Sequence, residues 1–170
     1  MPKNLIKEIL AGKIFIYPTD TIYGLGCNAL NKESVEKIRD IKGCSKEKPL
    51  SIIAPSIDWI REHCIVDIDL KKYLPGPFTL ILKKKNQKFL SHISSETLGV
   101  RIPNCPFCKK IQESNVPFIT TSVDISGENP ANEISEIDSK ILQKVDFVID
   151  VGRLNGKPST LVINGKEIER

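Results

Sequence analysis

Hydroxyl, carboxylate and glycine residues are concentrated in residues 17–27, directly after a short apolar run. The segment reads YPTDTIYGLGC, and residues 19–21 supply two hydroxyls and one carboxylate. Polar groups just beyond the carboxyl end of a strand are where α/β sheets usually bind ligands. Gly24 and Gly26 permit either a close backbone approach or a positive φ. The segment therefore predicts a binding site, and a turn capped by Thr and Asp is the alternative.

Three lysines lie in residues 42–51, which read KGCSKEKPLS and follow a predicted helix. Lys42, Lys46 and Lys48 could hold phosphate or carboxylate oxygens, because ammonium groups attract anions. The GxxxxGK[ST] spacing of a Walker A loop is absent, and so is GxGxxG. A solvated basic loop is the alternative interpretation.

Arg101 lies inside the apolar run GVRIP of residues 99–103. Because burying an unpaired charge is costly, this arginine must have an anionic partner. An Asp or Glu of the same chain is one candidate. A substrate carboxylate or phosphate is the other, because Arg binds either group with two hydrogen bonds.

A second predicted strand also runs into hydroxyls and a carboxylate. Residues 118–127 read FITTSVDISG, which repeats the pattern of residues 17–27. Two such polar strand ends, far apart in sequence, could meet in one pocket. Ser159, in the PSTL of residues 158–161, is a candidate for a third wall of that pocket.

Strand and helix patterns alternate along the chain, which indicates an α/β domain with a mixed sheet. The sequence shows no internal repeat and no interdomain linker, so we expect residues 1–170 to form one domain. Apolar runs predict strands and 3.6-residue periodicity predicts helices. The predicted strands are residues 14–17, 50–54, 79–82, 98–102, 118–122, 147–150 and 160–163. The predicted helices are residues 5–10, 31–43, 57–63, 67–74 and 137–145, with another near Lys109.

Composition narrows the class of protein. The chain has 170 residues, 40% hydrophobic and 27% charged, and 25 basic against 21 acidic residues give a net charge of +4. These values argue against intrinsic disorder and against a polycation. No apolar run approaches the roughly 20 residues of a membrane helix, and the first residues lack a signal-peptide pattern. Five cysteines cannot all pair within one chain, so we expect a reducing, cytoplasmic setting.

Cys105 and Cys108 form a lone CxxC at a predicted helix start, where thiol pKa values can fall. A structural zinc site needs about four ligands, and no second CxxC or CxxH pair follows. The sequence context of a thioredoxin-type redox motif is also missing. We therefore expect neither a metal nor a redox role for this pair.

The segments PTDTIYGLGC, KGCSKEKPLS, PGPFTLIL, GVRIP, TTSVDISGENP and PSTLV occur in an order that resembles the YrdC-domain family, the threonylcarbamoyl-AMP synthases. The resemblance covers about residues 14–163 and is of the single-domain type. It implies a YrdC/RibB-like twisted mixed sheet with flanking helices around a basic concave cavity. It also implies a nucleotidyltransferase that joins L-threonine, bicarbonate and ATP into threonylcarbamoyl-adenylate and releases pyrophosphate. A separate complex would then transfer the threonylcarbamoyl group to tRNA.

The resemblance also implies roles for individual residues. Lys42 and Arg101 match catalytic positions. Mg²⁺ would arrive with ATP, and no protein ligand for a metal is assigned. The positions that match threonine contacts are Thr21, Arg101, Thr120 and Ser159. The positions that match nucleotide contacts are Lys42, Cys44, Lys48, Thr97, Ser122, Asp124 and Pro130.

Two positions depart from the family pattern. Cys44 stands where the KxR element has Arg, and Asp124 stands where the SxN element has Asn. Both changes make the surroundings of a polyanionic substrate more negative. A catalytically weakened RNA- or nucleotide-binding module is therefore the alternative function. Double-stranded RNA or tRNA is a candidate partner, although the sequence has no RRM, KH or OB signature. A hydrogenase-maturation protein is a third class, but its acylphosphatase and zinc modules are not found in this sequence.

Overall fold

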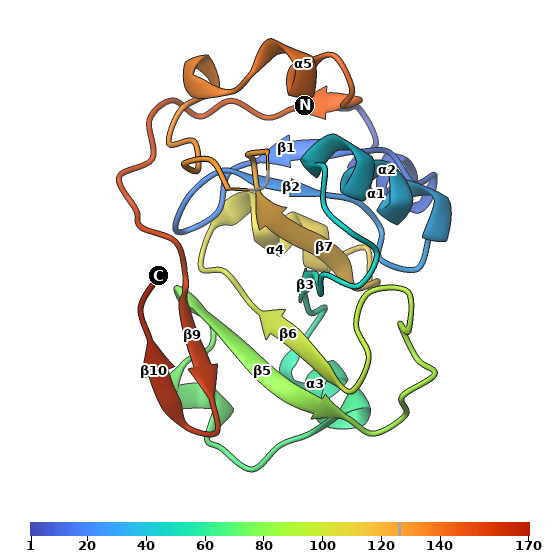
Figure 1. Ribbon diagram of the computed structural model, residues 1–170, viewed down its shortest axis with the longest axis vertical. Helices are drawn as coiled ribbons and strands as arrows, with labels where there is room; N and C mark the ends of the chain where they lie inside the picture. The colour runs from blue at the N-terminus through green and yellow to red at the C-terminus, as the bar shows by residue number, and fades with distance from the viewer. Residues whose placement is uncertain (126) are drawn as a thin grey trace.

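The strands form one ten-stranded mixed sheet in this computed structural model, which describes residues 1–125 and 127–170 (Figure 1). Ser126 lies outside the described residues. Neighbouring strands follow the order β10-β9-β5-β6-β3-β7-β2-β1-β8, and β4 pairs with β5. The pairs β1–β8, β3–β6 and β5–β9 are parallel, and the remaining pairs are antiparallel. The mixed α/β prediction is confirmed. The strands are β1 (Phe15–Tyr17), β2 (Gly24–Gly26), β3 (Ser51–Ile53), β4 (Cys64–Ile65), β5 (Phe78–Lys84), β6 (Thr97–Arg101), β7 (Phe118–Ser122), β8 (Phe147–Val148), β9 (Thr160–Ile163) and β10 (Lys166–Ile168).

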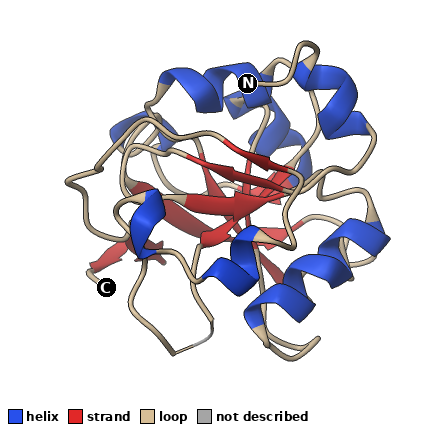
Figure 2. Cartoon of the chain, turned by 90° about the horizontal axis from the view of Figure 1, so that it is seen from above, coloured by secondary structure: helices blue, strands red, loops and turns tan. Residues whose placement is uncertain are grey.

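Helices lie on both sides of the sheet when the molecule is seen from above (Figure 2). The ends of α2 follow from its sequence, because the Asn31 side chain accepts a hydrogen bond from Ser34 N and Gly43 has a φ of 60°. An Asx cap and a left-handed glycine satisfy the free backbone groups at helix ends. The helix predicted over residues 57–63 is found with those bounds. The helices are α1 (Leu5–Leu10), α2 (Lys32–Lys42), α3 (Ile57–His63), α4 (Pro106–Gln112) and α5 (Ser139–Leu142), with the short 3₁₀ helices η1 (Leu70–Lys72) and η2 (Ile134–Glu136).

Strand β1 is buried on both faces, because successive residues enter different apolar clusters. Ile14 and Ile16 pack in the larger cluster, together with residues of α2. Phe15 and Tyr17 pack in a second cluster, together with residues of α1 and α4. Side chains alternate between faces along a strand, so a strand covered on both sides reads as a continuous apolar run. This burial explains why residues 14–17 are recognisable as a strand from sequence.

Strand β2 was not among the strands predicted from sequence. A Cβ atom on Gly26 would overlap the carbonyl oxygen of Ile119, and one on Gly24 would lie 2.8 Å from Cζ of Tyr17. Neither glycine has a positive φ. The sequence left two explanations open for these glycines, a positive φ or a close backbone approach. The structure shows the close backbone approach. Without it β2 could not lie between β1 and β7.

Two predicted helices are shorter than their apolar periodicity indicates. Only η1 forms within residues 67–74, and only α5 forms within residues 137–145. In both predicted ranges an aspartate inside the range is the N-cap of the shorter helix. Asp69 accepts a hydrogen bond from Lys71 N, and Asp138 accepts one from Lys140 N. The preference of Asp for N-cap positions thus overrides the apolar pattern. Strands β4 and β10 were not predicted, and both are short and lie at sheet edges.

Strand pairing brings the polar segments of the sequence together. Gly24 of β2 is paired with Ser122 of β7, and Thr120 of β7 is paired with Ser51 of β3. Strand β6 runs parallel to β3 and ends at Arg101. In this register Arg101, at the carboxyl end of β6, lies level with Ile53 and with Phe118, the first residue of β7, while Thr120 lies level with Ser51, at the other end of β3.

Candidate functional site

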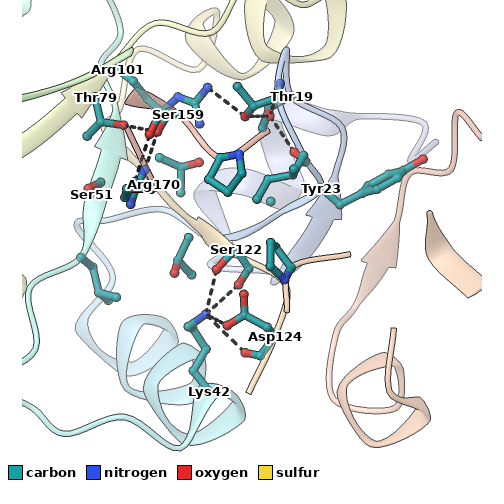
Figure 3. Close-up of a pocket in the computed structure, with 18 of the residues that line it drawn as sticks. Thr19, Tyr23, Lys42, Ser51, Thr79, Arg101, Ser122, Asp124, Ser159 and Arg170 are labelled. Atoms are coloured by element: carbon teal, nitrogen blue, oxygen red, sulfur yellow. Dashed lines mark hydrogen bonds and ion pairs between the residues drawn. The ribbon is translucent and has the colours of Figure 1, made fainter. Parts of the chain in front are cut away.

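A cavity of about 350 Å³ lies along these strands, beside the segment that follows β1 (Figure 3). Polar side chains from widely separated segments line it, and Figure 3 shows them in two groups at opposite ends. One end holds Arg101 and Ser159, and the other holds Lys42, Ser122 and Asp124. Of the eleven residues predicted for the site, these nine line the cavity: Thr21, Lys42, Lys48, Arg101, Thr120, Ser122, Asp124, Pro130 and Ser159.

Arg101 forms an ion pair at one end of the cavity. Its Nη2 donates to Asp20 Oδ1 at 2.7 Å and to Thr21 Oγ1 at 3.3 Å. Asp20 Oδ2 accepts a hydrogen bond from Asn104 N at 2.8 Å. The side chain of Arg101 is 7% exposed and that of Asp20 is 11% exposed, so the pair is nearly dehydrated. The chain itself therefore supplies the anionic partner that the sequence required for this arginine.

Asp20 does not saturate Arg101. All hydrogen bonds of the guanidinium among the described residues are donated by Nη2, and Nε is buried without a partner. A buried donor that lacks an acceptor costs about 1–3 kcal/mol. Arg101 thus keeps donor capacity at the cavity and can hold a further oxyanion while its charge is positioned by Asp20.

The segment after β1 is held by its own hydroxyls. Thr19 Oγ1 donates to the carbonyl oxygen of Ile22 at 2.6 Å and lies 2.9 Å from Thr21 Oγ1. Thr21 N donates to Thr19 Oγ1 at 3.1 Å. These bonds form the capped turn that was the alternative interpretation of this segment. Both interpretations are compatible, because the same turn brings Thr19 and Thr21 to the cavity wall.

Ser159 lies beside two residues that sequence reasoning missed. Its hydroxyl is 2.7 Å from Thr79 Oγ1 and accepts a hydrogen bond from Arg170 Nη2 at 2.5 Å. Burial of its guanidinium and the nearby positive charge of Arg101 lower the pKa of Arg170. Both Thr79 and Arg170 line the cavity. Nothing in the local sequence marks Arg170, because it belongs to the charged run KEIER, whose first three residues form β10.

A buried ion pair occupies the opposite end of the cavity. Lys42 Nζ lies 2.9 Å from Asp124 Oδ1, and the two side chains are 3% and 8% exposed. The ammonium also donates to the carbonyl oxygens of Ser122 at 2.7 Å and Asp124 at 3.3 Å. Asp124, the carboxylate that departs from the family pattern, is thus the direct partner of Lys42.

Arg39 positions the basic loop that follows α2, and the sequence did not single it out. The side chain is 2% exposed. Its Nη1 donates to the carbonyl oxygens of Ser45 at 3.1 Å and Lys48 at 2.6 Å, and its Nη2 donates to that of His92 at 3.1 Å. One buried guanidinium therefore holds residues 45–48 against a second loop, beside the cavity.

Cys44 and Thr97 are not among the residues that line the cavity. Cys44 follows the left-handed Gly43, is partly exposed, and donates its backbone N–H to the carbonyl oxygen of Arg39 at 3.2 Å. Thr97 begins β6, four residues before Arg101, so both residues lie on the same strand face. Their predicted roles at the nucleotide stay predictions.

The chain between β8 and β9, residues 149–159, runs down one side of the molecule (Figure 1), and Pro158 and Ser159 in it line the cavity. We call this segment the strap. Tyr23 is hydrogen-bonded to the strap. Its hydroxyl donates to the carbonyl oxygen of Gly152 at 2.6 Å and accepts a hydrogen bond from Val151 N at 3.0 Å. Gly156 approaches the backbone of Thr21 so closely that a Cβ atom there would overlap the Thr21 carbonyl oxygen.

We expect Gly156→Ala to displace the strap from Thr21, because a backbone carbonyl cannot yield as a side chain can. Overpacking of this kind costs about 1–3 kcal/mol, which corresponds to about five- to 150-fold in an equilibrium constant. The expected result is a lower midpoint of thermal unfolding and weaker binding of any oxyanion beside Thr21 and Arg101, measured by calorimetry. Lys157→Ala, an exposed neighbour in the strap, is the control and should leave both quantities unchanged.

Among residues 1–125 and 127–170 there is no cluster of three or more His, Cys, Asp or Glu side chains able to hold a metal ion. Within the same residues, no helix has the length and apolar character needed to cross a membrane.

Known proteins resemble this chain in sequence and in fold. The model of the Sua5/YciO/YrdC family, described as "Telomere recombination", matches residues 7–169. A Methanocaldococcus jannaschii protein, whose name gives threonylcarbamoyl-AMP synthase as a provisional assignment, is 43% identical over 93% of this chain and 77% of its own length. The threonylcarbamoyl-AMP synthase of Pseudoalteromonas translucida is 31% identical over 91% of this chain and 89% of its own.

Solved structures show the same fold. The crystal structure of P. abyssi Sua5 complexed with L-threonine matches with a TM-score of 0.80 and 30% identity, over 92% of this chain and 48% of that one. The chain thus spans about half of Sua5. Escherichia coli YciO, at 24% identity and a TM-score of 0.79, covers 97% of this chain and 88% of its own, and supports the fold alone.

Proposed function

The chain belongs to the Sua5/YciO/YrdC family, and from this premise we propose that it is a threonylcarbamoyl-AMP synthase. It would join L-threonine, bicarbonate and ATP into threonylcarbamoyl-adenylate and release pyrophosphate. The observation that carries the proposal is a cavity with an incompletely satisfied arginine at one end and a buried lysine at the other. Such a cavity suits a substrate pair that has a carboxylate in one member and phosphates in the other.

The Arg101 end would hold threonine. Its guanidinium has unused donors for a carboxylate, and Asp20 fixes its orientation. Hydroxyls of Thr21, Thr120 and Ser159 line the same cavity and offer hydrogen bonds to the amino acid. The relatives named as synthases and the Sua5 complex with L-threonine support this assignment.

The Lys42 end would hold ATP. Transfer of the adenylyl group needs the α-phosphorus placed beside a threonine-derived carbamate, while negative charge builds up on the departing pyrophosphate. This work is positioning and electrostatic stabilisation, so no protein nucleophile is required. Lys42 and Lys48 supply positive charge at the cavity. Arg170 lies at the other end of the cavity, where it donates to Ser159, so it does not replace the family Arg that is missing at position 44. Mg²⁺ would enter with the ATP phosphates as part of the substrate.

A second candidate function is supported by the Lys42–Asp124 pair. An ammonium already neutralised by a carboxylate at 2.9 Å has less charge to offer a phosphate. A chain of this kind could bind a nucleotide or RNA without efficient turnover. In either case the product, or the RNA, would pass to a separate tRNA-modification complex in the cytoplasm.

Pyrophosphate release tests the proposed function. We expect purified protein with ATP, Mg²⁺, bicarbonate and L-threonine to release pyrophosphate in proportion to threonine, and to form threonylcarbamoyl-adenylate detectable by mass spectrometry. Omission of threonine, or its replacement by L-valine, is the control. Nucleotide binding without threonine-dependent pyrophosphate would favour the second function, and absence of both would contradict the two together.

A further inference from the structure

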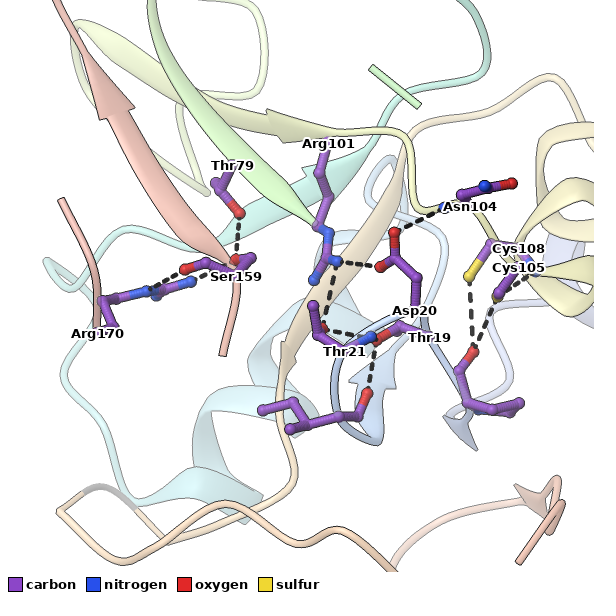
Figure 4. A network of polar contacts seen from close by, with 12 residues as sticks. Thr19, Asp20, Thr21, Thr79, Arg101, Asn104, Cys105, Cys108, Ser159 and Arg170 are labelled. Atoms are coloured by element: carbon purple, nitrogen blue, oxygen red, sulfur yellow. Dashed lines mark hydrogen bonds and ion pairs between the residues drawn. The ribbon is translucent and has the colours of Figure 1, made fainter. Parts of the chain in front are cut away.

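The two cysteines of the CxxC segment lie beside the threonine end of the cavity (Figure 4). Cys105 is the N-cap of α4, and its Sγ accepts a hydrogen bond from Cys108 N at 3.3 Å. The Sγ atoms of Cys105 and Cys108 lie 3.4 and 3.6 Å from the carbonyl oxygen of Pro18, and Figure 4 shows both directed at that one atom. The two thiols, at positions i and i+3, thus converge on one oxygen atom.

The same carbonyl begins the segment that carries the cavity residues. Among the described residues, these two thiols are the hydrogen-bond donors to the Pro18 oxygen. Pro18 is buried and directly precedes the Thr19–Thr21 turn. Asp20 in that turn binds Arg101 and also Asn104 N, the residue before Cys105. The thiols and the Arg101–Asp20 pair therefore join the same two segments of chain.

We propose that Cys105 and Cys108 form a reversible dithiol–disulfide pair whose oxidation weakens the grip of Arg101 and Thr21 on a carboxylate ligand. The disulfide has no S–H donor, so oxidation leaves the Pro18 carbonyl oxygen without its hydrogen bonds. A buried acceptor that loses its partners is unfavourable, and the backbone before Thr19 must shift to reach another donor. Because binding and oxidation are linked, the ligand in turn makes the disulfide easier to reduce. The ligand side of this proposal rests on the proposed function.

A low-molecular-weight disulfide is the oxidant that the step requires. The Cys105 thiolate attacks one of its sulfurs, forms a mixed disulfide and releases one thiol. The Cys108 thiolate then attacks Sγ of Cys105, closes the Cys105–Cys108 bond and releases the second thiol. Two electrons and two protons thus pass from the protein to the oxidant. A hydrogen bond from Cys108 lowers the pKa of the Cys105 thiol, and Cys105 is the more exposed of the two, so it is suited to attack first.

The test begins with equilibration of the intact protein in mixtures of reduced and oxidised glutathione. Both cysteines fall in one tryptic peptide, residues 102–109, so the disulfide appears as a loss of two hydrogens and of alkylation at both positions. A Cys44→Ser background removes the partly exposed thiol. We expect the peptide to oxidise within the glutathione range. Alkylation of both cysteines at every ratio would overturn the proposal.

Coupling to the site is measured in two independent ways. We expect oxidation to weaken L-threonine binding at least about fivefold, and saturating threonine to shift the disulfide equilibrium by the same factor. Hydrogen exchange at the N–H groups of Thr21 and Asn104 should also be faster in the oxidised protein. If the reduced protein binds no threonine, the proposed function is wrong. The hydrogen-exchange rates at Thr21 and Asn104 then decide alone whether oxidation of the cysteines alters this segment. Equal exchange and equal affinity in the two redox states would overturn it.

Variants separate the disulfide from the loss of the donor. Cys105→Ser combined with Cys108→Ser keeps hydroxyl donors near Pro18 and leaves no thiol there, so it should bind threonine like the reduced protein at every glutathione ratio. Cys105→Ala combined with Cys108→Ala removes both donors and should bind threonine like the oxidised protein. If the two variants bind equally, the Pro18 carbonyl is not the link between the cysteines and the site.

Discussion

Arg101→Leu is expected to abolish threonine-dependent pyrophosphate release at physiological threonine concentrations. Removal of one partner from a buried, hydrogen-bonded charge pair costs about 2–5 kcal/mol, or about thirty- to several-thousandfold in affinity. Arg101 would form such a pair with the threonine carboxylate, and it already forms one with Asp20. Calorimetry with L-threonine should show the loss as a higher Kd, and steady-state kinetics should show it as a lower kcat/KM for threonine.

The same substitution also strips Asp20 of its partner, which destabilises a protein by about 3–5 kcal/mol when the charge left behind is buried. A double variant separates the two effects. Arg101→Leu with Asp20→Asn should recover most of the free energy of unfolding but none of the threonine binding. Arg153→Leu is the matched control, because the ion pairs that Arg153 forms with Glu133 and Glu136 are exposed and contribute little to stability. Threonine binding by the double variant would contradict the role of Arg101.

Strands and helices could be predicted from sequence where the signal is local, as in a continuous apolar run for a buried strand or a cap residue at the end of a helix. The apolar run of residues 14–17 and the Asn31 and Gly43 caps of α2 each carry their own signal. Strand β2 carries none, since Gly-Leu-Gly reads as a turn until β1 and β7 enclose it. Its glycines are needed for contacts with residues far along the chain, and a single sequence does not reveal such contacts.

The site, too, has residues that the sequence indicates and contacts that it does not. The polar strand ends were recognisable, because α/β sheets usually bind ligands just beyond the carboxyl ends of their strands. The partners were not, since Lys42 and Asp124 are separated by 82 positions. Arg39 is the clearest case. It lies next to Ile38 on α2 and would be expected in solvent, yet it is buried because loop carbonyl groups need its donors. That need arises only once the loops have folded.

Asp124→Asn is expected to tighten ATP binding. The buried carboxylate lies at the cavity end that would receive phosphates, where it neutralises Lys42 and repels the nucleotide. At an effective dielectric constant of about 20 and a separation of roughly 6 Å, one unit charge is worth about 3 kcal/mol. We therefore expect the Kd for ATP to fall by about ten- to 100-fold, allowing for loss of part of this energy in the weaker hold on Lys42. Calorimetry with and without Mg²⁺ measures the change.

Two further variants decide what Asp124 does for the enzyme. Glu128→Gln removes a carboxylate from the exposed part of the cavity wall, where solvent screens it, so its Kd for ATP should hardly change. Cys44→Arg combined with Asp124→Asn restores both family residues and should raise the rate of pyrophosphate release, if the parent site is weakened by their loss. A double variant slower than the parent would show instead that Asp124 is part of an adapted site. Tighter ATP binding by Asp124→Asn only when Mg²⁺ is absent would point to the carboxylate as a partner of the metal carried by ATP. The ion would then compete with Lys42, whose Nζ lies 2.9 Å from Asp124 Oδ1, for this carboxylate.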